Sequence, residues 1–141
     1  MTDLHVDIAG VLFPNPILPA SGTYEVVELK DRFFDPAVLG AVINKTIFLQ
    51  PRPGNPPPRI YETPCGMLNS IGIPSEGAEH FIREQLPALR RVGPPVIVSV
   101  AETSLEGFRR ISLMIEETGM ADLLELDLSC PNVGHDAQWA E

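Results

Sequence analysis

Cysteine and positive charge are scarce in this sequence. Its two cysteines, Cys65 and Cys130, are far apart and form no C-x-x-C pair, which argues against a disulfide framework and a cysteine-rich zinc site. The three histidines are scattered without the i, i+4 spacing of a helical metal site, so we expect no bound metal. Ten basic residues against nineteen acidic ones give a net charge of -9. This balance argues against nucleic acid as a partner, because nucleic-acid phosphates require a basic face.

Long apolar runs are absent as well. No stretch approaches the run of about 18 apolar residues that predicts a membrane-spanning helix. The opening segment MTDLHVDIAG lacks the basic start and the apolar stretch of a signal peptide. We therefore expect a cytoplasmic protein with no membrane partner. An anionic ligand must be held by local positive charge, because the overall field of the protein repels it.

Proline and apolar residues are plentiful. Hydrophobic residues make up 44% of the 141 residues, which is enough for one domain with a sizeable core. Many of the fifteen prolines sit at the ends of apolar runs. This placement is typical of a fold with many junctions between strands and loops.

The order of the expected elements indicates a parallel α/β fold. Residues 4–13 alternate around Ala9 and Gly10 as a short hairpin, and the Pro- and Gly-rich residues 49–77 predict a long, irregular but ordered excursion. Strands are expected in residues 16–24, 41–44, 94–102 and 121–130, and helices in residues 75–92 and 104–119. Buried strands that alternate with helices form parallel βαβ units. The pattern fits either a small open sheet or the first half of a (β/α)8 barrel, which takes about 250 residues.

Polar residues gather where the expected strands end. The segments PASGT, NKT, SVAE and DLSCPN follow the four strands, and GMLNSIG lies in the long excursion. Ligands of parallel α/β folds bind at the carboxyl ends of the strands. Lys45 supplies charge there, Asn69 and Asn132 supply amides, and the small residues 20–22 leave room for a ring. The set suits a planar, polar, anionic ligand.

Each of these residues also has an ordinary structural interpretation. Lys45 suits a solvated lysine at a strand end, and Asn69 suits an Asx-turn before a glycine. Cys130 suits a small buried apolar side chain. From the residues alone, the sequence predicts a parallel α/β domain with a small-molecule site and no more.

Three long motifs in register resemble the dihydroorotate dehydrogenases. They are NKTIFLQPRPGNPPPR, ETPCGMLNSIGIPSEG and ELDLSCPN, and the resemblance spans residues 5–133. It is greatest to the class 1 enzymes, in particular the NAD-linked type 1B catalytic subunit. The resemblance implies an α/β fold, the first half of a (β/α)8 TIM barrel with an N-terminal hairpin and a long inserted loop. It also implies an oxidoreductase acting on CH–CH bonds, which uses flavin mononucleotide (FMN) to oxidise dihydroorotate to orotate in pyrimidine (UMP) biosynthesis.

The resemblance also implies roles for individual residues. Cys130 is the implied base, which takes the C5 proton of dihydroorotate while hydride passes from C6 to flavin N5. The implied cofactor-binding residues are Ala20, Ser21, Lys45, Thr46, Ser99 and Asp127. The implied substrate-binding residues are Lys45, Asn69, Ser70, Ile71, Gly72, Ile73, Asp127 and Asn132.

Two positions depart from the family pattern. Asparagine is usual in the family at the positions of Asp127 and Ser99. An ionised Asp127 only accepts hydrogen bonds and repels a substrate carboxylate, whereas an amide also donates. The change at Ser99 is milder, because a hydroxyl group still donates.

The sequence stops where the family continues with a lid loop and further βα units. The missing units carry the phosphate site, which barrels build after strands 7 and 8. We therefore expect residues 1–141 to be a single partial domain: a fragment, a truncated paralogue or one piece of a split barrel. Its expected partners are the missing half-barrel or further copies of the chain, and the type 1B resemblance implies a subunit with FAD and an iron–sulfur cluster. Two alternatives stay open, a dihydropyrimidine dehydrogenase-like flavoprotein subunit and a non-catalytic half-barrel that binds a partner through its open edge.

Overall fold

The computed structural model describes residues 2–29 and 32–130. Its strands are β1 (Val6–Ile8), β2 (Val11–Phe13), β3 (Val42–Ile43), β4 (Ile60–Thr63), β5 (Gly66–Asn69), β6 (Val96–Val100) and β7 (Leu123–Leu126). Its α-helices are α1 (Ala78–His80), α2 (Leu86–Arg90) and α3 (Leu105–Glu116), with a 3-10 turn at Pro36–Val38 and a π-helical turn at Phe81–Gln85. Asn132, an expected substrate-binding residue, lies outside the described residues.

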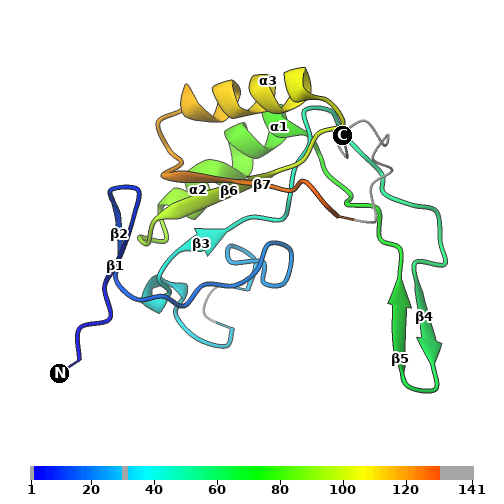
Figure 1. Ribbon diagram of the computed structural model, residues 1–141, viewed down its shortest axis with the longest axis horizontal. Coiled ribbons are helices and arrows are strands. Elements are labelled where there is room, and N and C mark those ends of the chain that lie inside the picture. Colours follow the sequence, from blue (N-terminus) through cyan, green and yellow to red (C-terminus); the bar gives the residue numbers. More distant parts are fainter. Residues whose placement is uncertain (1, 30–31, 131–141) are drawn as a thin grey trace.

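A parallel sheet of three strands organises the chain. Its strand order is β3-β6-β7, and both neighbouring pairs are parallel. The connections run through α1 and α2 between β3 and β6, and through α3 between β6 and β7. Helices α1 and α3 lie on the same face of the sheet (Figure 1), and Leu86 and Leu89 of α2 belong to the same core cluster as the β6 valines. The predicted parallel βαβ arrangement is therefore confirmed.

The side chains of strand β6 show how the two faces of the sheet differ. Successive side chains of a strand point to opposite faces, so Val96, Val98 and Val100 share one face. All three are fully buried and belong to the main core with Phe81 and Ile111 of the covering helical segments. Burial of each such side chain contributes roughly 1.5–3 kcal/mol. The alternation leaves Ser99 on the face away from the helices.

Helix α3 begins and ends where the sequence predicts. The Ser104 side chain accepts a hydrogen bond from the Gly107 N–H at 3.0 Å, which caps the first turn. Phe108, Ile111 and Ile115 follow at helical spacing and are buried. Gly119, with a φ of +62°, then ends the helical segment.

The helical segment before β6 begins later than expected and contains a π-helical turn. It starts at Ala78, after Gly77 with a φ of +89°, and not at residue 75. The Leu86 N–H donates to the Phe81 carbonyl, five residues back. Pro87 explains this local widening, because proline has no N–H to donate and its ring clashes with the carbonyl four residues back in a regular α-helix.

The strand expected in residues 16–24 is absent from the structure. Prolines at positions 14, 16 and 19 remove the backbone donors that a strand ladder requires. The Ile17 carbonyl accepts a backbone hydrogen bond from the Gly40 N–H at 2.7 Å, but no strand ladder forms there. The described part of the chain therefore has three strands in its parallel sheet, not the four that the sequence suggests.

The sequence predicts an irregular excursion over residues 49–77, but part of this segment forms regular strands. Strands β4 and β5 pair antiparallel within it, from Ile60 opposite Asn69 to Thr63 opposite Gly66. Prolines precede β4 and occupy the turn but do not interrupt either strand, which is why the ladder forms. The β4–β5 hairpin projects from the sheet (Figure 1), and its four large apolar side chains are exposed.

A second antiparallel pair lies near the start of the chain. Strands β1 and β2 pair from Val6 opposite Phe13 to Ile8 opposite Val11. Ala9 and Gly10 both have positive φ angles, 53° and 84°, as a two-residue hairpin turn of this hand requires. Among the described residues, no helix has the length and apolarity needed to cross a membrane.

Candidate functional site

A hollow of about 320 Å³ lies at the carboxyl edge of the parallel sheet. Its lining residues are Ser21, Gly22, Lys45, Thr46, Ile71, Ile73, Asp127 and Cys130. All of them except Gly22 are site residues that the sequence predicts. Four segments that are distant in the sequence thus meet at one place. We refer to this space as the hollow.

The parallel sheet explains why these residues meet. Strand β3 ends at Ile43, shortly before Lys45 and Thr46, and β7 ends directly before Asp127. Carboxyl ends of parallel strands lie along one edge of a sheet, so the residues that follow them are neighbours. The Asp127 N–H still donates to the Val100 carbonyl at 2.9 Å, which extends the pairing of β6 and β7 by one residue.

Gly22 lets the side chain of Lys45 lie along the hollow. A Cβ atom on Gly22 would stand 2.6 Å from Lys45 Cδ and 3.1 Å from Lys45 Cε. Gly22 also has a φ of +74°, a backbone conformation that glycine adopts with little strain. The turn is closed by Thr23, whose N–H and hydroxyl group both donate to the Ala20 carbonyl, at 3.1 and 2.7 Å.

Asp127 shapes the turn that carries Cys130. Its Oδ1 accepts a hydrogen bond from the Cys130 N–H at 3.2 Å, an Asx-type turn. Cys130 is half-buried and packs against the small cluster of Phe48, Ile73 and Ala101. An asparagine at position 127 makes the same turn with its amide oxygen, and presents an NH2 group in place of the second carboxylate oxygen.

The loop that contributes Ile71 and Ile73 is held in an unusual conformation. Gly72 and Ile73 have positive φ angles of 79° and 44°, and the value is a genuine outlier for a β-branched residue such as Ile73. Arg52 holds the loop, because its Nε donates to the Gly72 carbonyl at 3.0 Å and its guanidinium group lies 4.7 Å from the centre of the Phe48 ring. Strain of this kind concentrates at functional sites.

Four other residues expected at the site do not line the hollow. Ala20 is exposed in its turn, and Asn69 is exposed at the end of β5, opposite Ile60. Ser70 is exposed too, with its N–H on the Arg59 carbonyl at 2.8 Å. Gly72 is buried between Ile71 and Ile73. Their roles as ligand-binding residues stay predictions.

Ser99 lies behind the hollow and not in it. Its side chain is fully buried, and its Oγ lies 2.9 Å from Thr46 Oγ1 and 2.7 Å from Glu125 Oε1. The Ser99 N–H donates to Asn44 Oδ1 at 2.8 Å. Ser99 therefore supports a residue of the lining, Thr46, and its contact with a cofactor stays a prediction.

Two carboxyl groups outside the hollow have a lowered pKa. Hydrogen bonds from the backbone and side chain of His5 lower the pKa of Asp3. A hydrogen bond from Arg83 lowers the pKa of Glu84. Neither residue lines the hollow. Within residues 2–29 and 32–130, no group of three or more His, Cys, Asp and Glu side chains has the arrangement of a metal site.

Sequence reasoning missed Glu125, which lies behind the lining. It expected the small residues 20–22 to leave room for a ring, but it did not predict the close contact of Gly22 with Lys45. Glu125 had a signal in the sequence, since it is an acidic residue inside the otherwise apolar run LLEL, two positions before Asp127. Residues two apart in a strand share a face, so Glu125 belongs to the side of Asp127.

Comparison with known proteins identifies the family. The dihydroorotate dehydrogenase profile matches residues 3–141. The chain belongs to the dihydroorotate dehydrogenase family. The family resemblance that the three sequence motifs predict is therefore confirmed.

Curated members of the dihydroorotate dehydrogenase family are similar over nearly the whole chain. The catalytic subunit of dihydroorotate dehydrogenase B (NAD(+)) from Thermodesulfovibrio yellowstonii is 42% identical over 132 residues, which are 94% of this chain and 44% of that protein. The corresponding subunit from Desulforudis audaxviator is 44% identical over 128 residues, which are 91% of this chain and 42% of that protein. The chain thus spans less than half the length of these relatives.

A solved structure shows the fold. The structure described as DHODH from Eimeria tenella, in complex with ferulenol, superposes with a TM-score of 0.70 at 24% identity. The match covers 99% of this chain and 40% of that one. The fold is a mixed α/β arrangement with a parallel sheet, of the TIM-barrel type.

Proposed function

We propose that residues 1–141 form one partial domain, the amino-terminal half of a (β/α)8 barrel. The three parallel strands and their helices on one face are the repeating unit of such a barrel. Strand β7 lies at the edge of the described parallel sheet, and its Leu124 and Leu126 are exposed, which suits a sheet that continues and is covered by further elements. The curated relatives, of which this chain covers 44% or less in the two cases above, support the same proposal.

We propose that the protein carries out FMN-dependent oxidation of dihydroorotate to orotate, a step of pyrimidine biosynthesis. One observation carries this proposal: Lys45, Asp127 and Cys130 meet in a single hollow at the carboxyl edge of the sheet, in a chain of this family. The names of the relatives favour this activity over reduction of uracil-like rings and over a non-catalytic half-barrel.

The chemistry of the hollow fits the ring of a flavin. Its volume of about 320 Å³ is at the lower end of ligand pockets, roughly 300–1,000 Å³. Ile71 and Ile73 offer apolar contacts, Thr46 a hydroxyl group and Lys45 a positive charge, while Gly22 adds no side-chain bulk. Bound there, FMN would supply the acceptor for the hydride from C6 of dihydroorotate.

Cys130 is the proposed base. Its Sγ takes the proton from C5 of dihydroorotate, so that the C5–C6 bond becomes a double bond as the hydride leaves C6. The turn closed by Asp127 fixes the backbone of Cys130, and the cluster of Phe48, Ile73 and Ala101 packs against it. A base held in place contributes about 10²–10⁴-fold to such a step.

Lys45 is the proposed anchor of the substrate. Dihydroorotate and orotate carry a carboxylate, and the net charge of -9 disfavours its approach. Among the described residues that line the hollow, Lys45 is the one cationic side chain. The substrate is also proposed to contact residues 69–73 and Asn132, and the cofactor to contact Ala20, Ser21 and Thr46.

A partner subunit is part of the proposal. The relatives from Thermodesulfovibrio yellowstonii and Desulforudis audaxviator are named catalytic subunits, which implies a second subunit in those enzymes. We propose that this protein also passes electrons to a subunit with FAD and an iron–sulfur cluster.

The experiment that tests the function uses the purified full-length protein. We expect a visible flavin spectrum that bleaches when dihydroorotate is added under anaerobic conditions, with orotate as the product. Dihydrouracil is the matched control and leaves the spectrum unchanged. A protein without flavin, or one whose flavin responds to dihydrouracil and not to dihydroorotate, would contradict the proposal.

A further inference from the structure

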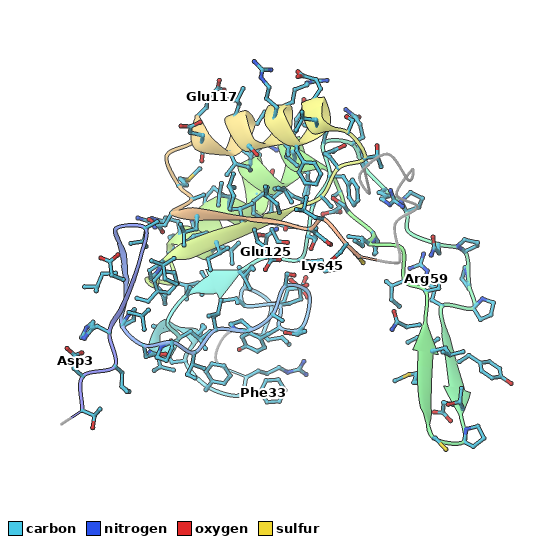
Figure 2. The ribbon with its side chains drawn as sticks, viewed as in Figure 1. Asp3, Phe33, Lys45, Arg59, Glu117 and Glu125 are labelled. Carbon is cyan, nitrogen blue, oxygen red and sulfur yellow. The ribbon has the colours of Figure 1, made fainter. Side chains whose placement is uncertain are left out.

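Glu125 lies on the side of the sheet that faces away from the helices. It stands opposite Ser99 in the parallel register of β6 and β7. Figure 2 shows Glu125 and Lys45 on this side, whereas Glu117 lies on the outer side with α3. Glu125 is half-buried, and its Oε1 accepts a hydrogen bond from the fully buried Ser99.

The hydrogen bonds between Glu125, Ser99 and Thr46 have one possible direction. Ser99 Oγ lies 2.7 Å from Glu125 Oε1 and 2.9 Å from Thr46 Oγ1. Ser99 Oγ donates to Glu125 Oε1, which uses the single hydroxyl proton of Ser99. Thr46 must then donate its own hydroxyl proton to Ser99.

Asn44 locks Ser99 in this arrangement. Asn44 Oδ1 accepts from the Ser99 N–H at 2.8 Å, which fixes the orientation of the amide. Its Nδ2 donates to the Lys45 carbonyl at 2.7 Å and to the Ser99 carbonyl at 3.3 Å. Ser99 has no exposed surface, so water does not compete for its hydroxyl group.

We propose that Glu125 is a positioning residue that makes Thr46 a hydrogen-bond acceptor in the hollow. Thr46 donates its hydroxyl proton to Ser99, which lies behind the lining of the hollow. A ligand atom that hydrogen-bonds to Thr46 Oγ1 must therefore be a donor. The inference rests on the proposed function and deepens it, because flavin and pyrimidine rings both carry an imide N–H. The chain Glu125–Ser99–Thr46 thereby selects ligands that present such a group.

Three variants of the full-length protein test the direction of this chain. Ser99→Ala removes its central link, Thr46→Val removes the acceptor, and Glu125→Gln replaces an acceptor-only group by one that also donates. We measure FMN binding to the apoprotein and orotate binding to the flavin-loaded protein, which shows which of the two rings contacts Thr46. Each variant should weaken binding of that ring by about fivefold or more, as expected for loss of one hydrogen bond in a buried site.

A double variant separates positioning from a general structural effect. If Glu125 acts through Ser99, then Glu125→Gln should add less than about twofold to the loss caused by Ser99→Ala. With ¹⁵N-labelled ligand, the imide N–H resonance should move toward its value in free ligand in all three single variants. Glu117→Gln, an exposed change at the end of α3, is the control and should alter neither quantity.

The possible outcomes are distinct. The inference would be overturned if Glu125→Gln weakened ligand binding equally in the wild-type protein and in the Ser99→Ala variant. An unchanged imide resonance in the variants would overturn it too. If Glu125→Gln fails to fold, ligand binding and the imide resonance of Ser99→Ala and Thr46→Val still test the inference, since each of these two changes alters only a small group. A wild-type protein that binds neither FMN nor orotate would contradict the proposed function and this inference together, whereas normal binding by every variant overturns this inference alone.

Discussion

Lys45 lies against Gly22 so closely that a Cβ atom at position 22 would stand 2.6 Å from Lys45 Cδ. The lysine is therefore positioned by the absence of a side chain on a neighbouring turn. This relationship explains how a flexible side chain is aligned along the hollow. It also makes Gly22 sensitive to substitution for a reason other than its backbone conformation.

Gly22→Ala should weaken orotate binding by about tenfold, which corresponds to about 1.4 kcal/mol. The new methyl group displaces the Lys45 side chain, and with it the positive charge that we propose holds the carboxylate of orotate. Orotate titration of the flavin-loaded protein measures the effect. The matched control is Gly10→Ala, because Gly10 also has a positive φ, +84°, but a Cβ there meets nothing within 4 Å. Equal orotate affinities in the two variants would show that the contact with Lys45 is unimportant.

Asp127→Asn should tighten orotate binding by about tenfold at neutral pH. The amide keeps the turn to Cys130 through its oxygen, removes a negative charge from the hollow and adds a donor. Asp7→Asn is a matched control, since Asp7 Oδ1 likewise accepts from a backbone N–H three residues later, that of Gly10 at 2.9 Å. Unchanged or weaker binding by Asp127→Asn would mean that this position does not contact the substrate.

Asp122 should stabilise the amino-terminal edge of the sheet. Its Oδ2 accepts from the Val96 N–H at 2.7 Å and from Arg90 Nη1. Asp122→Ala should lower the free energy of unfolding by about 1–3 kcal/mol, because the buried Val96 N–H loses its partner. Arg90→Ala breaks only the half-exposed ion pair and should cost less than about 1 kcal/mol. Urea denaturation measures both, and a larger loss for Arg90→Ala would contradict this explanation.

The sequence predicted the elements that depend on neighbouring residues, such as strand-forming runs and helix caps. A short run of β-branched residues bounded by prolines predicted β6, and Ser104 with Gly119 predicted the limits of α3. The strand expected in residues 16–24 failed because its prolines remove ladder donors, although its apolar residues suggest a strand. The β4–β5 hairpin was missed because its exposed side chains give no alternation between a buried and an exposed face.

Site residues that directly follow a parallel strand could be predicted from the sequence. Contacts that depend on how two strands align could not. Lys45, Thr46, Asp127 and Cys130 could be placed from the ends of β3 and β7 alone. The contact of Ser99 with Glu125 depends on how β6 and β7 align, which no local pattern specifies. The fit of Gly22 under Lys45 depends in the same way on tertiary packing.

We propose that this protein oxidises dihydroorotate with Cys130 as the base. The most direct test is anaerobic stopped-flow measurement of flavin reduction by dihydroorotate in the full-length protein. Cys130→Ala should slow flavin reduction by about 10²-fold or more. Cys65→Ala, which changes an exposed cysteine in the turn of the β4–β5 hairpin, should leave the rate nearly unchanged. Equal rates in the two variants would show that Cys130 is a packing residue and not the base.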